Sequence, residues 1–267
     1  MHVDLILGYK GFLSSYFYNF LKNRNKKIYL CGRKKLNIKK YYQINDISKK
    51  SLNLLLTKIK PNRIWNFVGE YKNNNIKTFY SNYIFTKNLL NTKYNIKFKP
   101  KILLIGSAAE YGVYKKKFSE NDNLRPINMY GFSKSLQSLY AKFHYLKFNS
   151  KVVVARLFNI IADRMPKKLF LGKILDDVKK KNKIKVVNYD SQRDYIDVNK
   201  ISPALFKILN KGEYGEVYNF GSGKPTKNID ILTYVFKKNK IKKKKIIKVK
   251  SLKKTTIYAD LKKFNKL

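Results

Sequence analysis

The chain of 267 residues carries a formal net charge of +44, and 44% of its residues are hydrophobic. At roughly 150 residues per domain, this length allows one large domain or two small ones. The apolar content is enough for a buried core, which excludes a disordered or fibrous chain. Only seven of the sixty basic residues are Arg, and the abundance of Lys, Asn, Ile, Tyr and Phe matches A/T-rich codons. We therefore attribute most of the charge to base composition and predict no specific nucleic-acid partner.

The sequence also limits the compartment in which the protein works. The single cysteine, Cys31, excludes a disulfide framework and indicates a reducing environment. No run of 18 or more apolar residues is present, so no membrane-spanning helix is expected. The N-terminus begins directly with a short apolar run and lacks the basic leader of a secretory signal. We predict a cytoplasmic protein with no membrane partner, and the absence of a Cys/His cluster predicts no metal site.

Apolar strands alternate with amphipathic helices through the first 158 residues. The apolar runs predict strands at 3–7, 27–31, 42–44, 63–69, 101–106 and 152–158. Helical spacing predicts helices at 12–21, 52–59, 78–90 and 129–146. Ser48 is a candidate cap for the second of these helices, and Pro61 ends it. This alternation predicts an α/β protein of the Rossmann type, with a doubly wound parallel sheet covered on both faces.

The regular alternation of strands and helices ends at Asn159, after which the connections become longer and irregular. A helix is expected near 169–181 and a strand at 217–220. We predict a dinucleotide-binding domain at 1–158 and a smaller, shortened C-terminal lobe at 159–267, with returns to the first domain near 193–222. The Lys-rich stretch at 237–250 has no interleaved aromatic residues for base stacking, so we interpret it as a solvated helix end and strand.

A glycine turn joins the first strand directly to the first helix. Gly8 permits the tight turn, and Gly11 lets the backbone approach a pyrophosphate at the helix N-terminus. The third glycine of the usual pattern is replaced by Ser14, for which we expect a slightly wider contact between helix and strand. The position of this turn after the first strand makes it a candidate phosphate-binding loop.

The second strand ends without the acidic residue that usually holds the adenosine ribose of NAD. Arg33 stands there instead, and its guanidinium suits the additional 2′-phosphate of NADP. We therefore predict NADP, with NAD as the alternative. Asp46, after the third strand, is placed to accept a hydrogen bond from an adenine amino group, although ordinary turn chemistry would explain it nearly as well.

Tyr130 and Lys134 lie four residues apart at the start of the long helix, on one helical face. Six Tyr-x-x-x-Lys pairs occur in the chain, so the spacing alone selects none of them. This pair follows the strand at 101–106 and the turn at Ser107, and ligands of open parallel sheets bind at the carboxyl ends of strands. We expect Lys134 to lower the pKa of the phenol from its usual value near 10. Together with the hydroxyl of Ser107, this pair can move the proton that accompanies hydride transfer.

These residues resemble the extended short-chain dehydrogenases that modify nucleotide sugars, the NAD-dependent epimerase/dehydratase family. The resemblance covers essentially the whole chain and rests on motifs in the family's order, GYKGFL, ND, NFVGE, NYIFTKNLL, GSAAEYG, LRPINMYGFSK, RLFN, RDYIDV and YNFGSG. It implies catalytic roles for Ser107, Tyr130 and Lys134. It implies that the dinucleotide contacts both of these helical residues together with Gly8, Gly11, Phe12, Leu13, Arg33, Asp46, Ile47, Val68 and Gly69. The substrate would be held by Ser107, Asn159 and Arg193, where an interdomain salt bridge is the alternative role for Arg193.

Departures from the family pattern narrow the expected reaction. The family's 4,6-dehydratases carry an acid where this chain has Ala109, which disfavours dehydration, and Glu110 is expected to point away. The motifs look most like those of reductases acting on GDP-4-keto-6-deoxymannose. Ala162-Asp163 replaces the usual Gly-Pro of a substrate loop, and the chain stops at Leu267, where relatives continue with another helix.

The leading hypothesis is therefore an NAD(P)-dependent reductase of a nucleotide sugar, making a deoxyhexose donor for surface polysaccharide. The alternative within the family is a nucleotide-sugar 4-epimerase, which would retain NAD and consume none. The alternative of another class is a cofactor- or RNA-binding protein that has lost catalysis. The resemblance further implies a homodimer that pairs through its long helices.

Overall fold

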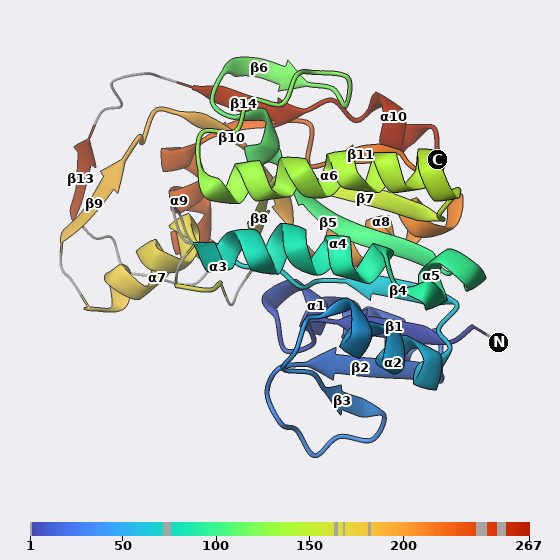
Figure 1. Ribbon diagram of the computed structural model, residues 1–267. Coiled ribbons are helices and arrows are strands. Elements are labelled where there is room, and N and C mark those ends of the chain that lie inside the picture. The colour runs from blue at the N-terminus through green and yellow to red at the C-terminus, as the bar shows by residue number, and fades with distance from the viewer. Residues whose placement is uncertain are drawn as a thin grey trace.

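The computed structural model describes residues 2–71, 76–162, 165–167, 169–180, 183–238, 245–249 and 255–267. Its centre is a seven-stranded sheet in the order β11-β7-β5-β4-β1-β2-β3, in which every pair of neighbours is parallel (Figure 1). The strands of this sheet are β1 (Asp4–Leu7), β2 (Ile28–Gly32), β3 (Tyr41–Gln43), β4 (Arg63–Asn66), β5 (Lys101–Ser107), β7 (Val152–Leu157) and β11 (Val217–Phe220). The predicted α/β Rossmann-type fold is confirmed.

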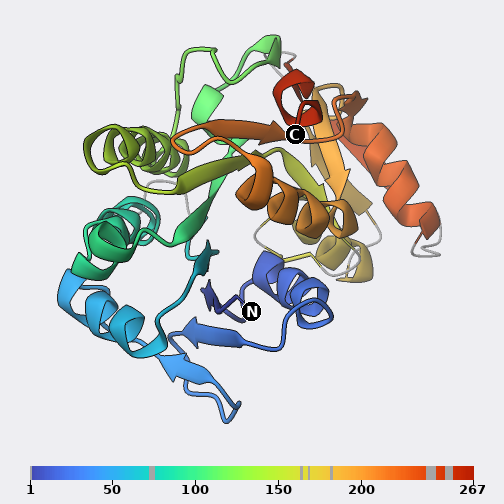
Figure 2. The same cartoon turned by 90° about the vertical axis from the view of Figure 1, so that its right-hand side faces the viewer.

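Helices cover both faces of the sheet, as Figure 2 shows. One face packs against α1 (Phe12–Lys22) and α8 (Val198–Lys211). The other face packs against α2 (Lys49–Ile59), α4 (Phe85–Leu90), α5 (Lys93–Phe98) and α6 (Met129–Phe148). Successive strand residues point to opposite faces, so runs such as Asp4–Leu7 are buried at every position. Burial on both sides explains why these strands show continuous apolar runs instead of alternation.

A second group of strands lies outside the seven-stranded sheet. It consists of a sheet in the order β12 (Pro225–Lys227), β10 (Gln192–Asp197), β14 (Thr256–Ala259) and β6 (Lys115–Phe118), with β8 (Asn159–Ile161) paired to β10. A separate parallel pair joins β9 (Lys183–Val187) and β13 (Lys245–Val249), which pack with α7 (Phe170–Lys180) and α9 (Asn228–Lys238). The short α10 (Lys262–Asn265) follows β14.

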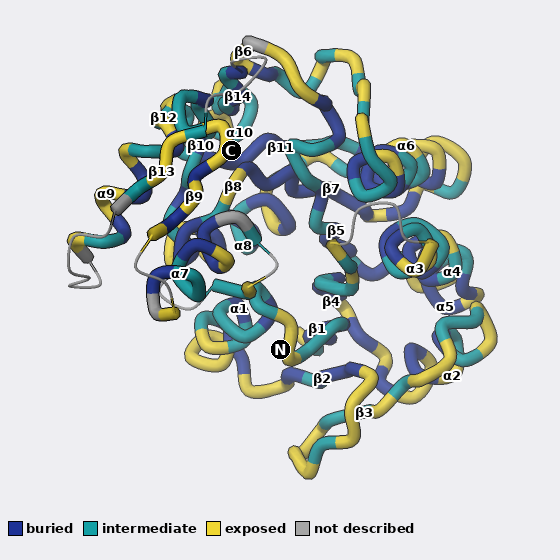
Figure 3. Tube along the Cα trace, turned by 90° about the vertical axis from the view of Figure 1, so that its left-hand side faces the viewer, coloured by how far each residue is buried: buried dark blue, intermediate teal, exposed yellow. Residues whose placement is uncertain are grey.

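One buried carboxylate, that of Asp194, connects parts of this group of strands by hydrogen bonds. Asp194 of β10 is fully buried and accepts hydrogen bonds from the backbone N–H groups of Ser222, Gly223 and Ala259 at 2.6, 2.9 and 3.1 Å. It thereby connects β10 to the turn after β11 and to β14. The tube in Figure 3 shows buried residues concentrated in the sheet and on the helix faces that contact it.

Several elements differ from the sequence prediction. β4 ends at Asn66, three residues early, because Phe67 to Gly69 leave the sheet to line a cavity. The helix predicted at 78–90 begins as α3 (Ile76–Phe79) and passes through a π-helical turn, Tyr80–Ile84, into α4. Helix α8 was not predicted, although Ile201, Leu205 and Ile208 bury one face of it against the sheet.

Some predictions fall partly outside the described residues. Asp163 and Lys181 are not among them, and the stretch 237–250 is described only at 237–238 and 245–249. The division into two domains at residue 158 stays a prediction. Within the described ranges, no helix has the length and apolar character needed to cross a bilayer, and no group of three or more His, Cys, Asp or Glu side chains is arranged for a metal ion.

Candidate active site

The glycine turn fits tightly against the end of β4. Gly8 has a φ of +80°, and a Cβ at this position would lie 2.8 Å from the backbone nitrogen of Val68. The backbone N–H groups of Gly8 and Tyr9 both donate to the carbonyl of Cys31, at 3.0 and 2.9 Å. Only glycine satisfies both the left-handed backbone and this close approach. The turn therefore takes the sharp course that the sequence predicted for a phosphate-binding loop.

Ser14 strengthens this turn instead of widening it. The side chain is buried, and its hydroxyl lies 2.9 Å from the carbonyl oxygen of Gly8 and 3.0 Å from that of Gly11. Gly11 caps α1 with no side-chain hydrogen bond, and the first turn of the helix contains no acidic residue. The N–H groups in the first turn of α1 and the positive end of the helix dipole are thus available to an anion.

A cavity of about 510 Å³ extends from this turn over the carboxyl ends of β1, β2 and β4. Its size is typical of small-molecule sites. Among the predicted cofactor residues, it is lined by Gly8, Gly11, Arg33, Ile47, Val68 and Gly69. The tight turn, the open helix N-terminus and the volume of this cavity fit a dinucleotide.

Five predicted cofactor residues do not line this cavity: Tyr130 and Lys134, described below, and Phe12, Leu13 and Asp46. Leu13 lines a neighbouring cavity instead, and Phe12 packs its ring against Tyr16. Asp46 is exposed, and its carboxylate accepts hydrogen bonds from the backbone and hydroxyl of Ser48, at 2.8 and 2.6 Å. These bonds, with another from Ser51, hold the pKa of Asp46 below its usual value. The structure therefore gives Asp46 a turn role at the start of α2, and its contact with adenine stays a prediction.

A second cavity, of about 530 Å³, contains the predicted proton-transfer residues Ser107 and Tyr130. Ser107 ends β5, and Tyr130 lies in the first turn of α6, which Asn128 caps by accepting from the N–H of Gly131 at 2.8 Å. A Cβ on Gly131 would lie 2.4 Å from the carbonyl oxygen of Ala109. This close packing brings the start of α6 against the turn after β5 and so brings the two hydroxyl groups together.

The predicted lowering of the Tyr130 pKa is wrong for the protein without cofactor. Burial of the phenol raises its pKa to about 12, and a hydrogen bond with the Ser107 side chain opposes this only in part. The ring of Tyr71 packs edge-on against Tyr130, with centroids 4.8 Å apart, and helps to exclude water from it. Tyr130 therefore holds its proton at neutral pH.

Lys134 lies behind the tyrosine and is only 4% exposed. Its ammonium donates to the carbonyl of Ile105 at 2.7 Å and to Oε1 of Gln137 at 3.1 Å. A Cβ on Gly69 would lie 3.4 Å from the Lys134 nitrogen, so this ammonium also borders the wall of the cofactor cavity. Burial lowers the Lys134 pKa to about 8, and the charge of Glu110 opposes that shift. The ammonium is thus anchored to the end of β5 instead of being directed at the phenol.

Glu110 points away from both cavities, as expected from its position. It is fully buried and forms an ion pair with Arg156 of β7, with Oε2 2.8 Å from Nη2. Its other oxygen accepts from the backbone N–H of Ser107 at 2.7 Å. Arg156 also donates to the hydroxyl of Tyr111 at 2.6 Å. This pair, which sequence reasoning did not identify, fixes the Ser107 turn to the sheet.

The predicted substrate residues Asn159 and Arg193 line the same cavity as Ser107 and Tyr130. The Asn159 amide donates to the carbonyl of Asp194 at 3.1 Å, and Arg193 donates to the carbonyls of Gln192 and Thr255 at 2.8 and 3.2 Å. No described carboxylate forms an ion pair with Arg193. Desolvation lowers the pKa of its guanidinium, as expected for a cation in a cavity without a counter-ion.

Sequence reasoning missed two further polar groups of the site. Tyr195 lines the second cavity and donates to Oδ1 of Asn228, which also lines it, at 2.8 Å. Asn82 is buried in the π-helical turn, where its amide donates to the Ser133 hydroxyl at 3.0 Å and its oxygen accepts from the Glu70 backbone at 3.0 Å. The motif NYIFTKNLL begins at Asn82 and was the available signal for it. π-helical turns of this kind often occur at functional sites.

Comparisons with known proteins agree with this geometry. A model of the "NAD dependent epimerase/dehydratase family" matches residues 5–221. A UDP-glucose 4-epimerase of Mycoplasma genitalium is 26% identical to this chain over 267 aligned positions, covering 85% of this chain and 78% of that protein. A GDP-6-deoxy-D-talose 4-dehydrogenase of Aggregatibacter actinomycetemcomitans is 29% identical over 180 positions, covering 65% of this chain and 60% of that enzyme.

Among solved structures, that of RMD from Pseudomonas aeruginosa complexed with NADPH superposes with a TM-score of 0.83 at 20% identity, covering 99% of this chain and 91% of that one. This likeness shows the shared fold. The chain spans between 52% and 60% of the length of several curated relatives that it matches. The family model, however, matches well over half of the chain, and the chain therefore belongs to the NAD-dependent epimerase/dehydratase family.

Proposed function

We propose that the protein reduces the 4-keto group of a nucleoside-diphospho-6-deoxyhexulose with NADPH. The observation that carries this proposal is the protonated Tyr130 beside Ser107 on the wall of the second cavity. That cavity adjoins the dinucleotide cavity, since the consecutive residues Glu70 and Tyr71 line one each. A bound nicotinamide supplies the hydride that is transferred to the carbonyl carbon. The chain supplies the proton for the carbonyl oxygen.

The Tyr130 pKa near 12 supports reduction over oxidation as the reaction direction. A phenol with this pKa is an acid at pH 7, and ionising it there costs about 7 kcal/mol at 1.36 kcal/mol per pH unit. In reduction, the phenol starts protonated and gives its proton to the oxygen that becomes a hydroxyl. The Ser107 hydroxyl, hydrogen-bonded to it, orients the same oxygen. The Lys134 ammonium, held at the end of β5 one helical turn from Tyr130, adds a positive charge on the side of the phenolate left after the transfer.

The dinucleotide is held by the turn of Gly8 and Gly11 and by the open N-terminus of α1, which favour its phosphates. Arg33 is exposed at the rim of the same cavity, together with Lys34. This basic rim, and the absence of an acid at the end of β2, support NADP over NAD. Arg33→Ala should weaken NADPH binding by tenfold or more and leave NADH binding nearly unchanged. Lys34→Ala is the matched control, and equal effects of Arg33→Ala on both cofactors would remove the argument for NADP.

The substrate cavity supports an anionic substrate. Arg193 is an unpaired cation among the described residues around it, and a guanidinium binds diphosphate oxygens well. Asn159 lies beside it on the cavity wall. Glu110, the acidic residue nearest in sequence to the dehydratase position, is buried in its pair with Arg156. A dehydratase acid is thus missing from the described wall of this cavity.

Tyr130→Phe tests the proposal directly. Purified protein is supplied with 4-keto-6-deoxyhexose nucleotides and NADPH, and the loss of NADPH absorbance is followed. We expect Tyr130→Phe to reduce turnover by about 10²–10⁴-fold, the usual contribution of a general acid, with cofactor binding retained. Tyr140→Phe, on the same helix but outside both cavities, is the control. Near-normal turnover of Tyr130→Phe would refute the role of the phenol.

A 4-epimerase is the second candidate, favoured by the similarity to the Mycoplasma enzyme over 85% of this chain. An epimerase must first remove a proton from the sugar hydroxyl, for which Tyr130 has to ionise. It would interconvert nucleotide sugars with no net consumption of NADPH. Product analysis in the same assay separates the two reactions, because only a reductase oxidises one NADPH for each sugar formed.

We further propose that two copies pair through α6. Its apolar side chains Phe132, Leu139, Phe143 and Leu146 are between 45% and 71% exposed. Their spacing places them on one side of the helix, an arrangement that is costly to leave in water. A second copy of the same helix would cover them through a self-complementary contact. Leu139→Lys should shift the protein from dimer to monomer in light scattering, and an unchanged mass would contradict this interface.

A further inference from the structure

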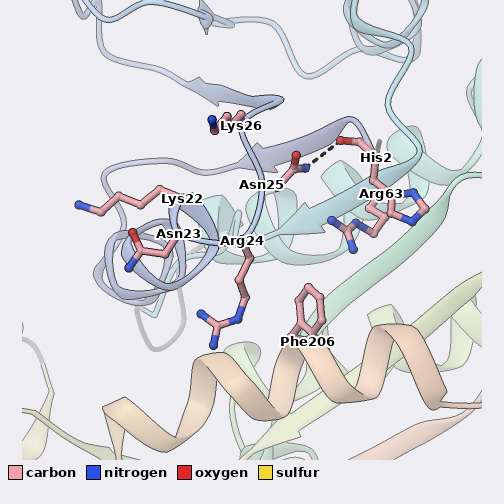
Figure 4. Close-up of a pocket in the computed structure, with 8 residues that line it drawn as sticks. All are labelled: His2, Lys22, Asn23, Arg24, Asn25, Lys26, Arg63 and Phe206. Carbon is pink, nitrogen blue, oxygen red and sulfur yellow. Dashed lines mark hydrogen bonds between the residues drawn. The ribbon is translucent and has the colours of Figure 1, made fainter.

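Two cavities at the amino ends of the strands form a groove on the opposite side of the sheet from the proposed active site. Their volumes are about 520 and 700 Å³. Both are lined by His2 and Arg63, so they lie next to each other. Figure 4 shows the first, where Phe206 of α8 lies beside the Arg24 side chain, with His2 and Arg63 on the other side of the ring. Neither cavity shares a lining residue with the two cavities of the proposed active site.

All but one of the cations that line the groove lack an acidic partner among the described residues. Arg63 is paired with the buried Asp4, with Nη2 2.6 Å from Oδ2, so its charge is compensated. The remaining cations along the groove are Lys22, Arg24, Lys26, Lys60, Lys99, Lys101 and Lys151. No acidic residue is among the described residues that line either cavity. Eight of the 18 residues that line the two cavities are Lys or Arg, about twice the share of these residues in the whole chain, 60 of 267.

The groove is long compared with a single phosphate group. Its lining residues precede or begin β2, β1, β4, β5 and β7, which are neighbours in that order. At about 4.8 Å between adjacent strands, the path across the four intervals is about 19 Å. One strand of nucleic acid, at about 3.4 Å per phosphate in a duplex and more when extended, places up to about five phosphates along this path.

Aromatic side chains distinguish this groove from a simple basic surface. Phe98, at the end of α5, is 60% exposed and lines the larger cavity beside the buried Tyr94, whose ring centroid is 4.8 Å away. An exposed ring next to lysines is the arrangement on which bases of a single strand stack. A chain of inorganic phosphate would not use such a ring. We propose that this groove binds single-stranded nucleic acid without sequence preference, as a function separate from the dinucleotide site.

The test compares groove lysines with lysines elsewhere on the full-length protein. Lys26, Lys60 and Lys151 are exposed, and replacing all three by Gln removes three charges from the groove. The matched control replaces Lys173, Lys183 and Lys185 of α7 and β9, which are equally exposed. Binding of a labelled oligouridylate of about 12 nucleotides is measured by fluorescence anisotropy over a range of salt concentrations.

Each phosphate contact to a single strand contributes about −0.7 to the slope of the logarithm of the binding constant against the logarithm of the salt concentration. Losing three contacts should therefore weaken binding about 100-fold at about 0.1 M salt and flatten the slope by about 2. The control variant should lose less than about threefold, and both variants should bind the dinucleotide normally. Equal losses in the two variants would overturn the proposal, because the overall charge of the protein would then explain the binding. Failure of the wild-type protein to bind the oligonucleotide at this salt concentration would also overturn it.

Phe98→Ala tests the chemical class of the ligand. It should weaken oligouridylate binding about tenfold, the usual effect of losing one stacked base, and leave the binding of inorganic polyphosphate unchanged. Equal effects on the two ligands, or no effect on either, would overturn the assignment to nucleic acid. A thermal melt of each variant confirms that it is folded before binding is compared.

Discussion

The buried pair of Glu110 and Arg156 offers a sharp test of how the sheet supports the Ser107 turn. Glu110 is fully buried, and its Oε2 accepts from Arg156 Nε and Nη2 at 3.0 and 2.8 Å and from the Ser138 hydroxyl at 2.8 Å. Its Oε1 holds the backbone of Ser107. We expect Glu110→Gln to destabilise the fold and loosen Ser107, because it removes the charge and keeps the shape.

The magnitude follows from the burial of both partners. Arg156 is 2% exposed, so without the carboxylate its charge has no access to water. Removing one partner of such a pair costs about 3–5 kcal/mol, a large share of the 5–15 kcal/mol typical of folded domains. At about 2–4 °C per kcal/mol for a chain of this size class, the melting temperature should fall by about 6–20 °C. Since the Glu110 charge raises the pKa of Lys134, that pKa should also fall below its value of about 8.

Stability is measured by urea unfolding and thermal melts at pH 7. Asp176→Asn, which removes a carboxylate paired with Lys167 and Lys180 on the surface, is the matched control and should leave stability close to that of the original protein. Replacing Glu110 and Arg156 together by Met should recover most of the loss, because no charge is then left buried. A loss below about 1 kcal/mol for Glu110→Gln, or a double variant less stable than the single one, would refute this reasoning.

Three further predictions concern the cofactor turn and two titrating groups. Gly8→Ala should weaken dinucleotide binding at least tenfold in a calorimetric titration, because its Cβ would lie 2.8 Å from the Val68 nitrogen at a φ of +80°; unchanged affinity would contradict the close approach. Turnover should fall as pH rises through about 8, where Lys134 loses its charge. A turnover that does not change up to pH 10 would show that this charge is dispensable. Burial lowers the pKa of His144 to about 4 from 6.5, so the unfolded chain takes up its proton first as pH falls. The contribution of neutral His144 to the free energy of unfolding is complete above pH 6.5 and is lost as the pH falls toward 4. About 2 kcal/mol of this free energy is lost between pH 7 and pH 5. His144→Gln should flatten this dependence in urea unfolding, and an equal slope in both proteins would contradict it.

The sequence by itself determined the central sheet and the elements that position its carboxyl edge. β1, β5 and β7 are continuous apolar runs because parallel strands bury both faces, and such runs can be recognised without knowing their neighbours. The caps Ser48 and Asn128 act within three residues of themselves, accepting from the N–H groups of Ser51 and Gly131. Contacts of this range are encoded locally, which is why the starts of α2 and α6 could be predicted from the chain alone.

Only the tertiary structure decided which side chains of the site pair with each other and how their pKa values shift. The partners Glu110 and Arg156 are 46 residues apart, and no local pattern joins them. Lys134 is anchored to the carbonyl of Ile105, and burial raises the Tyr130 pKa to about 12, whereas the charge of a neighbouring Lys134 was expected to lower it. The sheet of β12, β10, β14 and β6 and the groove at the amino ends also arise from segments far apart in the chain. Desolvation and long-range pairing depend on what surrounds a group in space, and that surrounding exists only once the chain has folded.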